Sequence, residues 1–131
     1  MTSADSLYTS RIREYLSQLE RGDAAAICAL FASDAQVYSP LLGWVSPRPF
    51  FEKLSAASGQ SSITPIDVCV STTGAARATG YFVYEWALKD GPTVRFECVD
   101  VFEFDEAGRI ARLVIIYDTY PIRASLGDSF S

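Results

Sequence analysis

The sequence contains no histidine, and this absence excludes more chemistry than any other feature of its composition. A Ser-His-Asp triad, a Cys-His pair and an imidazole metal site are all ruled out, so proton transfer must use carboxylates, phenols or lysines. The three cysteines, Cys28, Cys69 and Cys98, are odd in number and far apart, which favours reduced, buried thiols over a disulfide framework or a zinc site. We therefore expect neither a metal nor a cofactor.

Basic residues are scarcer than acidic ones, with Lys and Arg totalling 11 against 16 for Asp and Glu, and the net charge is −5. Binding to a phosphate backbone needs clustered Lys and Arg, so nucleic acid is not an expected partner. No apolar run approaches the ~20 residues of a membrane span, and residues 1–10 lack the pattern of a secretion signal. These absences predict a soluble cytoplasmic protein that does not bind membranes.

The residues that are present suffice for one core. Of the 131 residues, 49% are hydrophobic, and a chain of this length buries roughly two thirds of the surface that it exposes when unfolded. The sequence contains no linker, internal repeat or low-complexity block. We expect residues 1–131 to form a single domain, with a loose polar tail over residues 124–131.

The first half of the chain has the pattern of three helices. Apolar residues at helical spacing predict a first helix over residues 4–21. Asp23 is a suitable N-cap for a second helix. Its expected apolar side consists of Ile27, Leu30 and Phe31. A short strand is predicted over residues 35–38, and a third helix begins after Ser46 with Pro47 in its first turn.

The second half has the pattern of an antiparallel sheet. Segments rich in Val, Ile, Phe and Tyr alternate with turns that contain glycine. These segments cover residues 66–71, 77–88, 94–104 and 110–118. Helices first and hairpins afterwards indicate an α+β fold in which the helices cover one face of the sheet.

The other face of the last two strands is apolar as well. It is expected to carry Val99, Val101, Val114 and Ile116, with charged residues around them. An apolar patch rimmed by charge commonly marks an association surface, which predicts a homodimer formed through the sheet. The alternative is that the sheet curls and covers this face itself.

Asp100 interrupts an otherwise apolar strand face in "RFECVDVFEF", residues 95–104. Its neighbours on that face are Phe96, Cys98, Phe102 and Phe104. The next strand adds Leu113, Ile115 and Tyr117, and supplies no cation there. A carboxyl group in such surroundings loses hydration, which raises its pKa. Asp100 is therefore expected to be protonated or bound by donors, the alternative being a structural Asp satisfied by backbone amides or a buried water.

Tyr15 lies on the apolar stripe of the first helix, so its hydroxyl group enters the core and should find a partner there. Most tyrosines in such a position are packing residues. The position gains interest because the helix must cover the sheet that carries the buried Asp100.

Two segments carry a family resemblance: "REYLSQLERGDAAAICALFASDAQVYSP" and "ECVDVFEFDEAGRIARLVIIYDTYP". Together with the Pro-rich bend and third helix between them, they resemble the ketosteroid isomerases and polyketide cyclase-like proteins of the nuclear transport factor-like superfamily, over about residues 8–121. The resemblance implies a cystatin-like roll, which is a cone of curved antiparallel sheet around a long helix, with an apolar cavity and frequent dimers. It constrains function less, because the superfamily includes isomerases, cyclases, dehydratases, epoxide hydrolases and binding domains.

The resemblance also assigns roles to individual residues. Tyr15 stands where the isomerases have the tyrosine that donates to the substrate oxyanion, and Asp100 stands where they have the protonated acid beside it. Ser39 occupies the position of the general base, and a serine without a histidine accepts no proton at neutral pH. Glu85 and Asp118 are then the candidate bases, with a polar rim role as the alternative for both.

The direction of Glu85 is left open by the sequence. Alternation of Phe82, Tyr84 and Trp86 turns Glu85 outward if these aromatic side chains line the cavity, whereas the family pattern turns it inward. The remaining substrate-binding wall is expected to consist of Ser39, Phe31, Trp44, Phe96, Cys98, Phe102, Leu113, Ile115 and Tyr117. An epoxide hydrolase of this superfamily would need an arginine where Cys98 stands, which argues against that activity.

Two functions follow from these expectations. The first is an acid–base enzyme that acts on a small apolar carbonyl compound as an isomerase, cyclase or dehydratase, with Tyr15 and Asp100 as donors or with Asp100 as a proton shuttle. The second is a non-catalytic module that binds an apolar ligand, or that uses its sheet as an interaction surface. Loss of the base favours the module, whereas retention of a buried acid at a cost in stability favours the enzyme.

Overall fold

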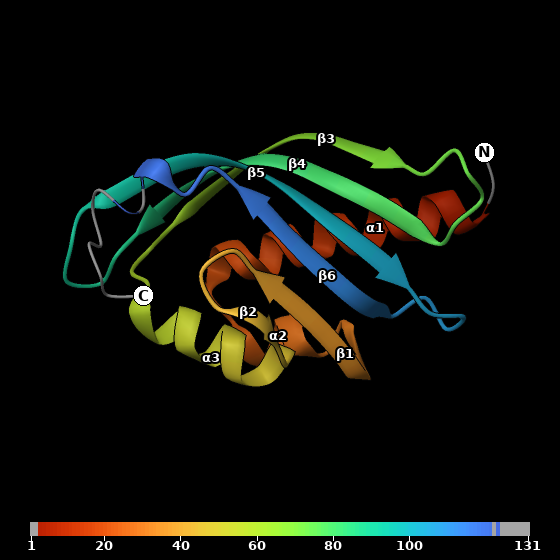
Figure 1. Cartoon of the computed structure of the whole chain (residues 1–131), viewed down its shortest axis with the longest axis horizontal. Helices are drawn as coiled ribbons and strands as arrows, with labels where there is room; N and C mark the ends of the chain where they lie inside the picture. The colour runs from red at the N-terminus through yellow and green to blue at the C-terminus, as the bar shows by residue number, and fades with distance from the viewer. Residues whose placement is uncertain (1–2, 122, 124–131) are drawn as a thin grey trace.

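The computed structural model describes residues 3–121 and 123, and Figure 1 shows how its helices and strands are arranged. The elements are α1 (Ser3–Arg21), α2 (Ala24–Cys28), β1 (Phe31–Ser39), β2 (Gly43–Val45), α3 (Pro47–Ala57), β3 (Ser62–Val70), β4 (Arg77–Ala87), β5 (Thr93–Phe104) and β6 (Ile110–Tyr117). The tail predicted over residues 124–131 lies outside the described residues.

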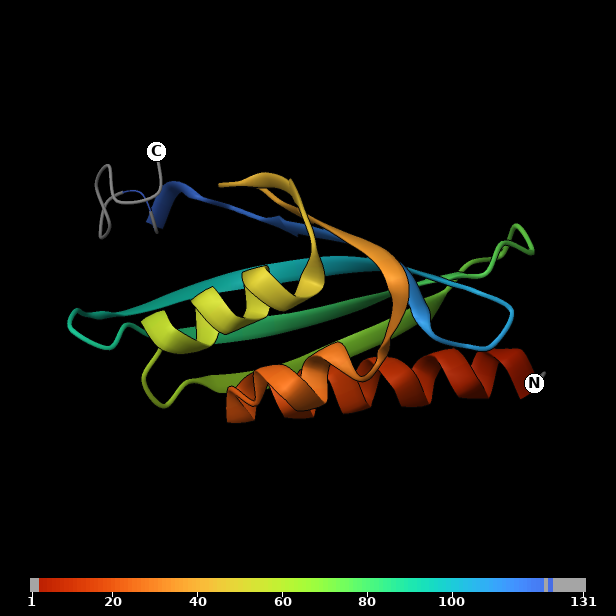
Figure 2. The ribbon, with the colours of Figure 1, turned by 90° about the horizontal axis from the view of Figure 1, so that it is seen from below.

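The six strands form one curved, unclosed sheet in the order β2-β1-β6-β5-β4-β3 (Figure 1). Neighbouring strands are antiparallel except for β1 and β6, which run parallel. Between these two strands the chain passes through β2, α3 and the long hairpins. Seen from below in Figure 2, α2 and α3 lie in front of the strands and α1 runs along the sheet. The predicted α+β fold with three N-terminal helices is confirmed.

The first helix has the apolar stripe that its sequence predicts. Its core side chains, all buried, are Ile12, Tyr15, Leu16 and Leu19. Gly22, at φ +70°, ends the helix in the left-handed conformation that favours glycine, and its N–H donates to the Leu19 carbonyl at 3.1 Å. Asp23 then caps α2 by accepting a hydrogen bond from the Ala26 N–H at 3.1 Å. This local chemistry fixes the reversal between α1 and α2.

The second helix is shorter than its apolar pattern predicts. Leu30 and Phe31 do not belong to it, since α2 ends at Cys28 and β1 begins at Phe31. The reason is tertiary: Phe31 pairs with Ile110 of β6, and the Ile110 N–H donates to the Leu30 carbonyl at 3.0 Å. Strand pairing therefore takes over two apolar residues that the local pattern assigns to a helix.

The core lies between the helices and the inner face of the sheet. The apolar neighbours of Asp100 on β5 are all buried, as the alternation predicts: Phe96, Cys98, Phe102 and Phe104. The strand pairing is regular where β5 faces β4, so side chains on both strands follow the same alternation. Asp100 is thereby placed among aromatic and aliphatic side chains.

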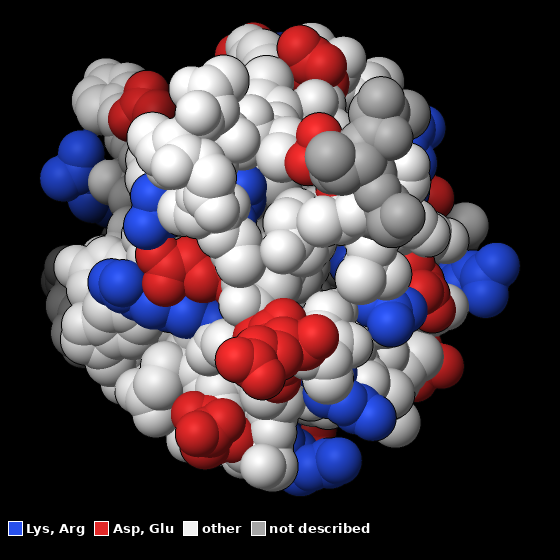
Figure 3. Space-filling view, turned by 90° about the vertical axis from the view of Figure 1, so that its right-hand side faces the viewer, with Lys and Arg blue, Asp and Glu red and all other residues white. Residues whose placement is uncertain are grey.

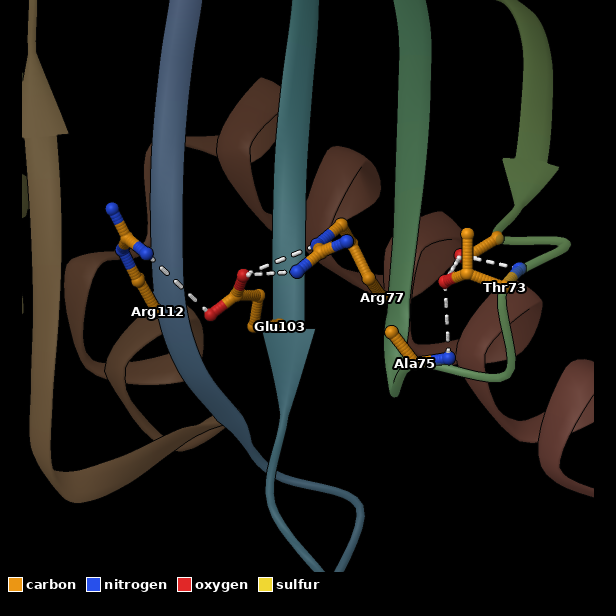
Figure 4. A network of polar contacts seen from close by, with 6 residues as sticks. Thr73, Ala75, Arg77, Glu103 and Arg112 are labelled. Carbon is orange, nitrogen blue, oxygen red and sulfur yellow. Dashed lines mark hydrogen bonds and ion pairs between the residues drawn. The ribbon is translucent and has the colours of Figure 1, made fainter.

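The outer face of the sheet combines apolar and charged side chains. Val99 and Ile116 are 37% and 50% exposed there. Close by, Glu103 forms ion pairs with Arg77 at 3.1 Å and with Arg112 at 3.7 Å (Figure 4). The face of the molecule drawn in Figure 3 likewise has Lys and Arg interspersed with Asp and Glu. Exposed pairs of this kind contribute little to stability, about 0–1 kcal/mol each.

Candidate functional site

A cavity of about 70 Å³ lies between α1, α3, the turn after β1 and the inner face of the sheet. The helices contribute Tyr15, Leu19, Phe50 and Leu54 to its wall. The turn contributes Ser39, Leu41 and Leu42. The sheet contributes Phe82, Tyr84, Trp86, Phe96, Cys98, Asp100, Ile115 and Tyr117. The wall is therefore predominantly apolar and aromatic, and contains no Lys or Arg.

Among the described residues, Asp100 is the only carboxylic acid in this wall. Its side chain is 1% exposed, and Oδ1 has no hydrogen-bond partner among the residues described. Desolvation by burial holds the pKa of the carboxyl group well above its ordinary value. Burial therefore favours the protonated form of this carboxyl group, which carries an O–H that can donate a hydrogen bond.

Tyr15 reaches the same cavity from α1. Its ring packs edge-on against three aromatic rings, with centroids at 6.3 Å for Phe31, 6.0 Å for Phe51 and 5.1 Å for Phe102. Burial raises the pKa of the phenol well above its ordinary value, and nearby Asp100 raises it further. Burial thus favours the protonated phenol, and the three rings packed against it hold it in a fixed orientation.

Ser39, in the position that the resemblance gives to the general base, has a structural contact of its own. Its Oγ accepts hydrogen bonds from the Leu41 N–H at 3.2 Å and the Leu42 N–H at 3.3 Å. The hydroxyl group thus stabilises the turn after β1, which carries both leucines to the cavity. It supplies no base.

The two candidate bases lie outside the cavity. Glu85 is exposed on the outer face of β4, opposite Arg95, so the inward orientation implied by the family pattern is wrong. The aromatic alternation gives the correct side, because Phe82, Tyr84 and Trp86 line the cavity. Asp118 is exposed after β6, and its Oδ1 accepts from the Tyr120 N–H at 2.9 Å. The structure therefore brings neither carboxylate to Asp100.

The prediction of which side chains line the cavity is partly correct. Of the predicted side chains, those that line it are Ser39, Phe96, Cys98, Ile115 and Tyr117. Buried behind the wall, in the core, are Phe31, Phe102 and Leu113. Trp44 is misplaced by the prediction, since it lies 48% exposed on β2, where the Arg112 guanidinium stacks 4.8 Å from its ring centroid. Trp44 lies opposite Tyr38 of β1, which is also exposed, so strand alternation turns both side chains away from the helices.

Sequence reasoning missed Tyr84 as a wall residue. Its side chain is a third phenol in the described part of the wall, besides those of Tyr15 and Tyr117. Burial raises the pKa of Tyr84, with Asp100 among the smaller causes. The alternation with Phe82 and Trp86 contained the signal, because all three share the face that points toward the helices.

No group of three or more His, Cys, Asp or Glu side chains in residues 3–121 and 123 is arranged to hold a metal ion. Within the same ranges, no helix is long and apolar enough to cross a membrane.

Several solved protein structures are similar to this one. Among solved structures, BvnE pinacolase from Penicillium brevicompactum is similar with a TM-score of 0.80 and 12% identity, over 95% of this chain and 91% of that one. SalBIII, an epoxide hydrolase/cyclase-like enzyme in pyran ring formation in the polyether salinomycin, has a TM-score of 0.73 and 20% identity, over 87% and 92%. A protein of unknown function with a cystatin-like fold from Methylobium petroleophilum PM1 has a TM-score of 0.70 and 19% identity, over 86% and 76%.

These likenesses establish the fold alone, and no curated protein sequence matches the chain significantly. The family is established by sequence: the model of the SnoaL-like domain matches residues 12–113, which is most of the chain. The chain therefore belongs to the SnoaL-like domain family of the nuclear transport factor-like superfamily.

Proposed function

We propose that this protein is an acid–base enzyme that acts on a small, uncharged carbonyl compound as an isomerase, cyclase or dehydratase. The supporting observation is Asp100, whose Oδ1 is buried without a hydrogen-bond partner in an apolar cavity. An unsatisfied buried polar group destabilises a fold by about 1–3 kcal/mol. Costs of this kind persist mainly where they serve function.

Tyr15 and Asp100 would both donate hydrogen bonds to one substrate oxygen. Burial raises the pKa values of both groups, which favours their protonated forms, and each lines the cavity. Donors that are fixed in advance in a water-poor site stabilise negative charge as it develops on a carbonyl oxygen. The edge-on packing of Tyr15 against Phe102 supports such fixed placement.

With a single cavity carboxyl group, Asp100 would both give and take the proton. The Asp100 O–H gives its proton to the substrate oxygen, and the resulting carboxylate accepts a proton from a substrate carbon. The acid is then regenerated, and the net change is movement of one proton within the substrate. This scheme needs no second base, consistent with the structural role of the Ser39 hydroxyl group.

The cavity restricts the substrate class. Its volume of about 70 Å³ and its aromatic wall favour a compact, planar compound. The absence of Lys and Arg from the wall disfavours carboxylates and phosphates, because a desolvated anion needs a cation or several donors. Two similar structures are named as a pinacolase and an epoxide hydrolase/cyclase-like enzyme, which supports a catalytic role.

A second candidate is a non-catalytic module that binds an apolar ligand. The observation that favours it is that residues 3–121 and 123 bring no carboxylate other than Asp100 to the cavity wall. In this case the two donors would hold a ligand oxygen without transferring a proton.

Turnover of neutral ketones, enones and β-hydroxyketones separates the two candidates. We expect the wild type to convert at least one member of such a panel, and Asp100→Asn to abolish conversion. Glu85→Gln is the matched control, since it removes an exposed carboxylate from the outer face of β4. Binding of panel members without conversion would refute the enzyme and support the binding module.

We also propose that the protein forms a homodimer through the outer face of its sheet. Val99 and Ile116 are exposed there as cross-strand partners, and the pair two positions along the strands, Val101 and Val114, is half-buried. Ion pairs around Glu103 lie beside this patch, which gives it the charged rim typical of association surfaces (Figure 4).

A further inference from the structure

Gly80 lies within β4, directly opposite Asp100 of β5. Glycine in the interior of a strand weakens it, because it has no side chain to pack and loses more conformational entropy on folding. The glycines with positive φ are Gly22, Gly43, Gly74 and Gly108, so backbone conformation does not explain a glycine at position 80. The close packing around position 80 explains it.

A Cβ atom at Gly80 would lie 2.9 Å from Ile12 Cγ2 and 3.7 Å from Phe102 Cε1. Both neighbours are fully buried, and the β-branched Ile12 side chain is stiff at χ1 in a helix. Ordinary contact begins at 3.4 Å, so a methyl group would displace Ile12 by 0.5 Å (3.4 − 2.9) or more. Gly80 therefore permits the close approach of α1 to the sheet.

The displacement would reach Tyr15. Ile12 and Tyr15 are one turn apart on the same buried side of α1, so a shift of the helix moves both. The Tyr15 ring has no free room to compensate, because Phe51 and Phe102 pack against it and are themselves buried. Asp100, on β5, does not move with the helix.

We infer that Gly80 is a positioning residue, which lets α1 lie close enough for Tyr15 to reach the same ligand oxygen as Asp100. The inference rests on the proposed function, in which the two groups hold one oxygen. A misplacement of about 1 Å remote from the chemistry can cost about a hundredfold in rate. For Gly80→Ala we expect about a tenfold loss of turnover, on the same scale.

Binding of p-cresol and toluene provides the direct test, because the two ligands differ only in a hydroxyl group. We expect Gly80→Ala to lower the preference for p-cresol over toluene by about threefold to tenfold, the effect of one hydrogen bond, with the affinity for toluene unchanged. Gly59→Ala is the matched control, since its Cβ would lie at an ordinary 3.7 Å from Ala87. It should leave the preference at the wild-type value.

A second substitution tests the contact itself. Ile12→Ala removes Cγ2, so the double variant Gly80→Ala/Ile12→Ala should recover the preference for p-cresol. Ile12→Val keeps Cγ2, so Gly80→Ala/Ile12→Val should not. An unchanged preference in Gly80→Ala, or a parallel loss of affinity for both ligands, would overturn the inference.

Two further comparisons keep the outcome decisive. Should Gly80→Ala alone fail to fold, Ile12→Ala is compared with Gly80→Ala/Ile12→Ala: equal preferences support the contact, and a lower preference in the double variant overturns it. A wild type without any preference for p-cresol refutes the donor pair and with it the proposed function. A wild-type preference that Gly80→Ala leaves intact refutes only the role of Gly80.

Discussion

The ring of Tyr15 packs edge-on against the ring of Phe102, with the centroids 5.1 Å apart. Phe102 follows Asp100 by two positions on the same face of β5, so this contact ties the phenol of α1 to the strand that carries the acid. The inner face of the sheet holds most of the other aromatic side chains of the cavity wall, and Phe50 of α3 adds one more. The site is thus built largely from core packing, and its substitutions are expected to affect stability as well as binding.

The stability of the protein should report the ionisation of Asp100. Its pKa in the folded protein is raised by burial, whereas in the unfolded chain it is near 4. Above pH 4 the unfolded state therefore holds fewer protons at this group, and the free energy of unfolding falls by up to about 1.4 kcal/mol per pH unit until the folded pKa is passed. Urea denaturation of the wild type and of Asp100→Asn between pH 4 and pH 8 measures this difference.

Asp100→Asn has nearly the same shape and does not titrate, so the other carboxyl groups cancel in the comparison. The stability of the variant relative to the wild type should increase with pH. Parallel stability curves across the whole range would show that Asp100 keeps an ordinary pKa in the folded protein.

Ligand binding should depend on the two donors. Tyr15→Phe is expected to weaken the binding of a phenol by about threefold to tenfold, because it deletes one hydrogen bond of about 0.5–1.5 kcal/mol. Asp100→Leu should weaken it by at least as much. Isothermal titration calorimetry gives both affinities, and Tyr8→Phe is the matched control, since Tyr8 stacks on Phe104 at 4.3 Å and does not line the cavity. If neither substitution changes the affinity, the donor pair has only a structural role.

A carboxylate at position 39 should create the missing base. We expect the wild type to isomerise a β,γ-unsaturated ketosteroid poorly, and Ser39→Asp to increase the rate by about 10²–10⁴-fold, the usual contribution of general-base catalysis. Ser39→Asn is the control for the turn, because its amide oxygen can accept from Leu41 and Leu42 as the serine does and yet takes no proton. The rate is followed by the absorbance of the conjugated product. High activity in the wild type would contradict this account of the base.

The outer face of the sheet should control the oligomeric state. Ile116→Lys places a charge in the middle of the exposed apolar patch and is expected to convert dimers into monomers in sedimentation velocity experiments. Ile66→Lys is the matched control, because Ile66 on β3 is 48% exposed, compared with 50% for Ile116. A wild type that sediments as a monomer at high concentration would argue that the patch remains open to solvent.

The burial of Asp100 follows from local sequence because a strand has a fixed period of two. Once the face that contains Phe96 and Phe102 is identified as the core face, Asp100 must share it. The same rule gives the outward direction of Glu85 from its aromatic neighbours. The boundary at Phe31 could not be predicted in this way, because pairing with the distant Ile110 decides it.

The sequence by itself determined the fold class, the alternation that buries Asp100 and the apolar stripe that carries Tyr15, since these depend on periods within single elements. Only the tertiary structure decided which of the buried side chains face an open space. It placed Tyr84 and Phe50 in the wall and Phe31 in the core behind it. The physical reason is that the curvature of the sheet and the close approach of α1 to Gly80 determine where the helices contact the sheet and where a cavity remains between them.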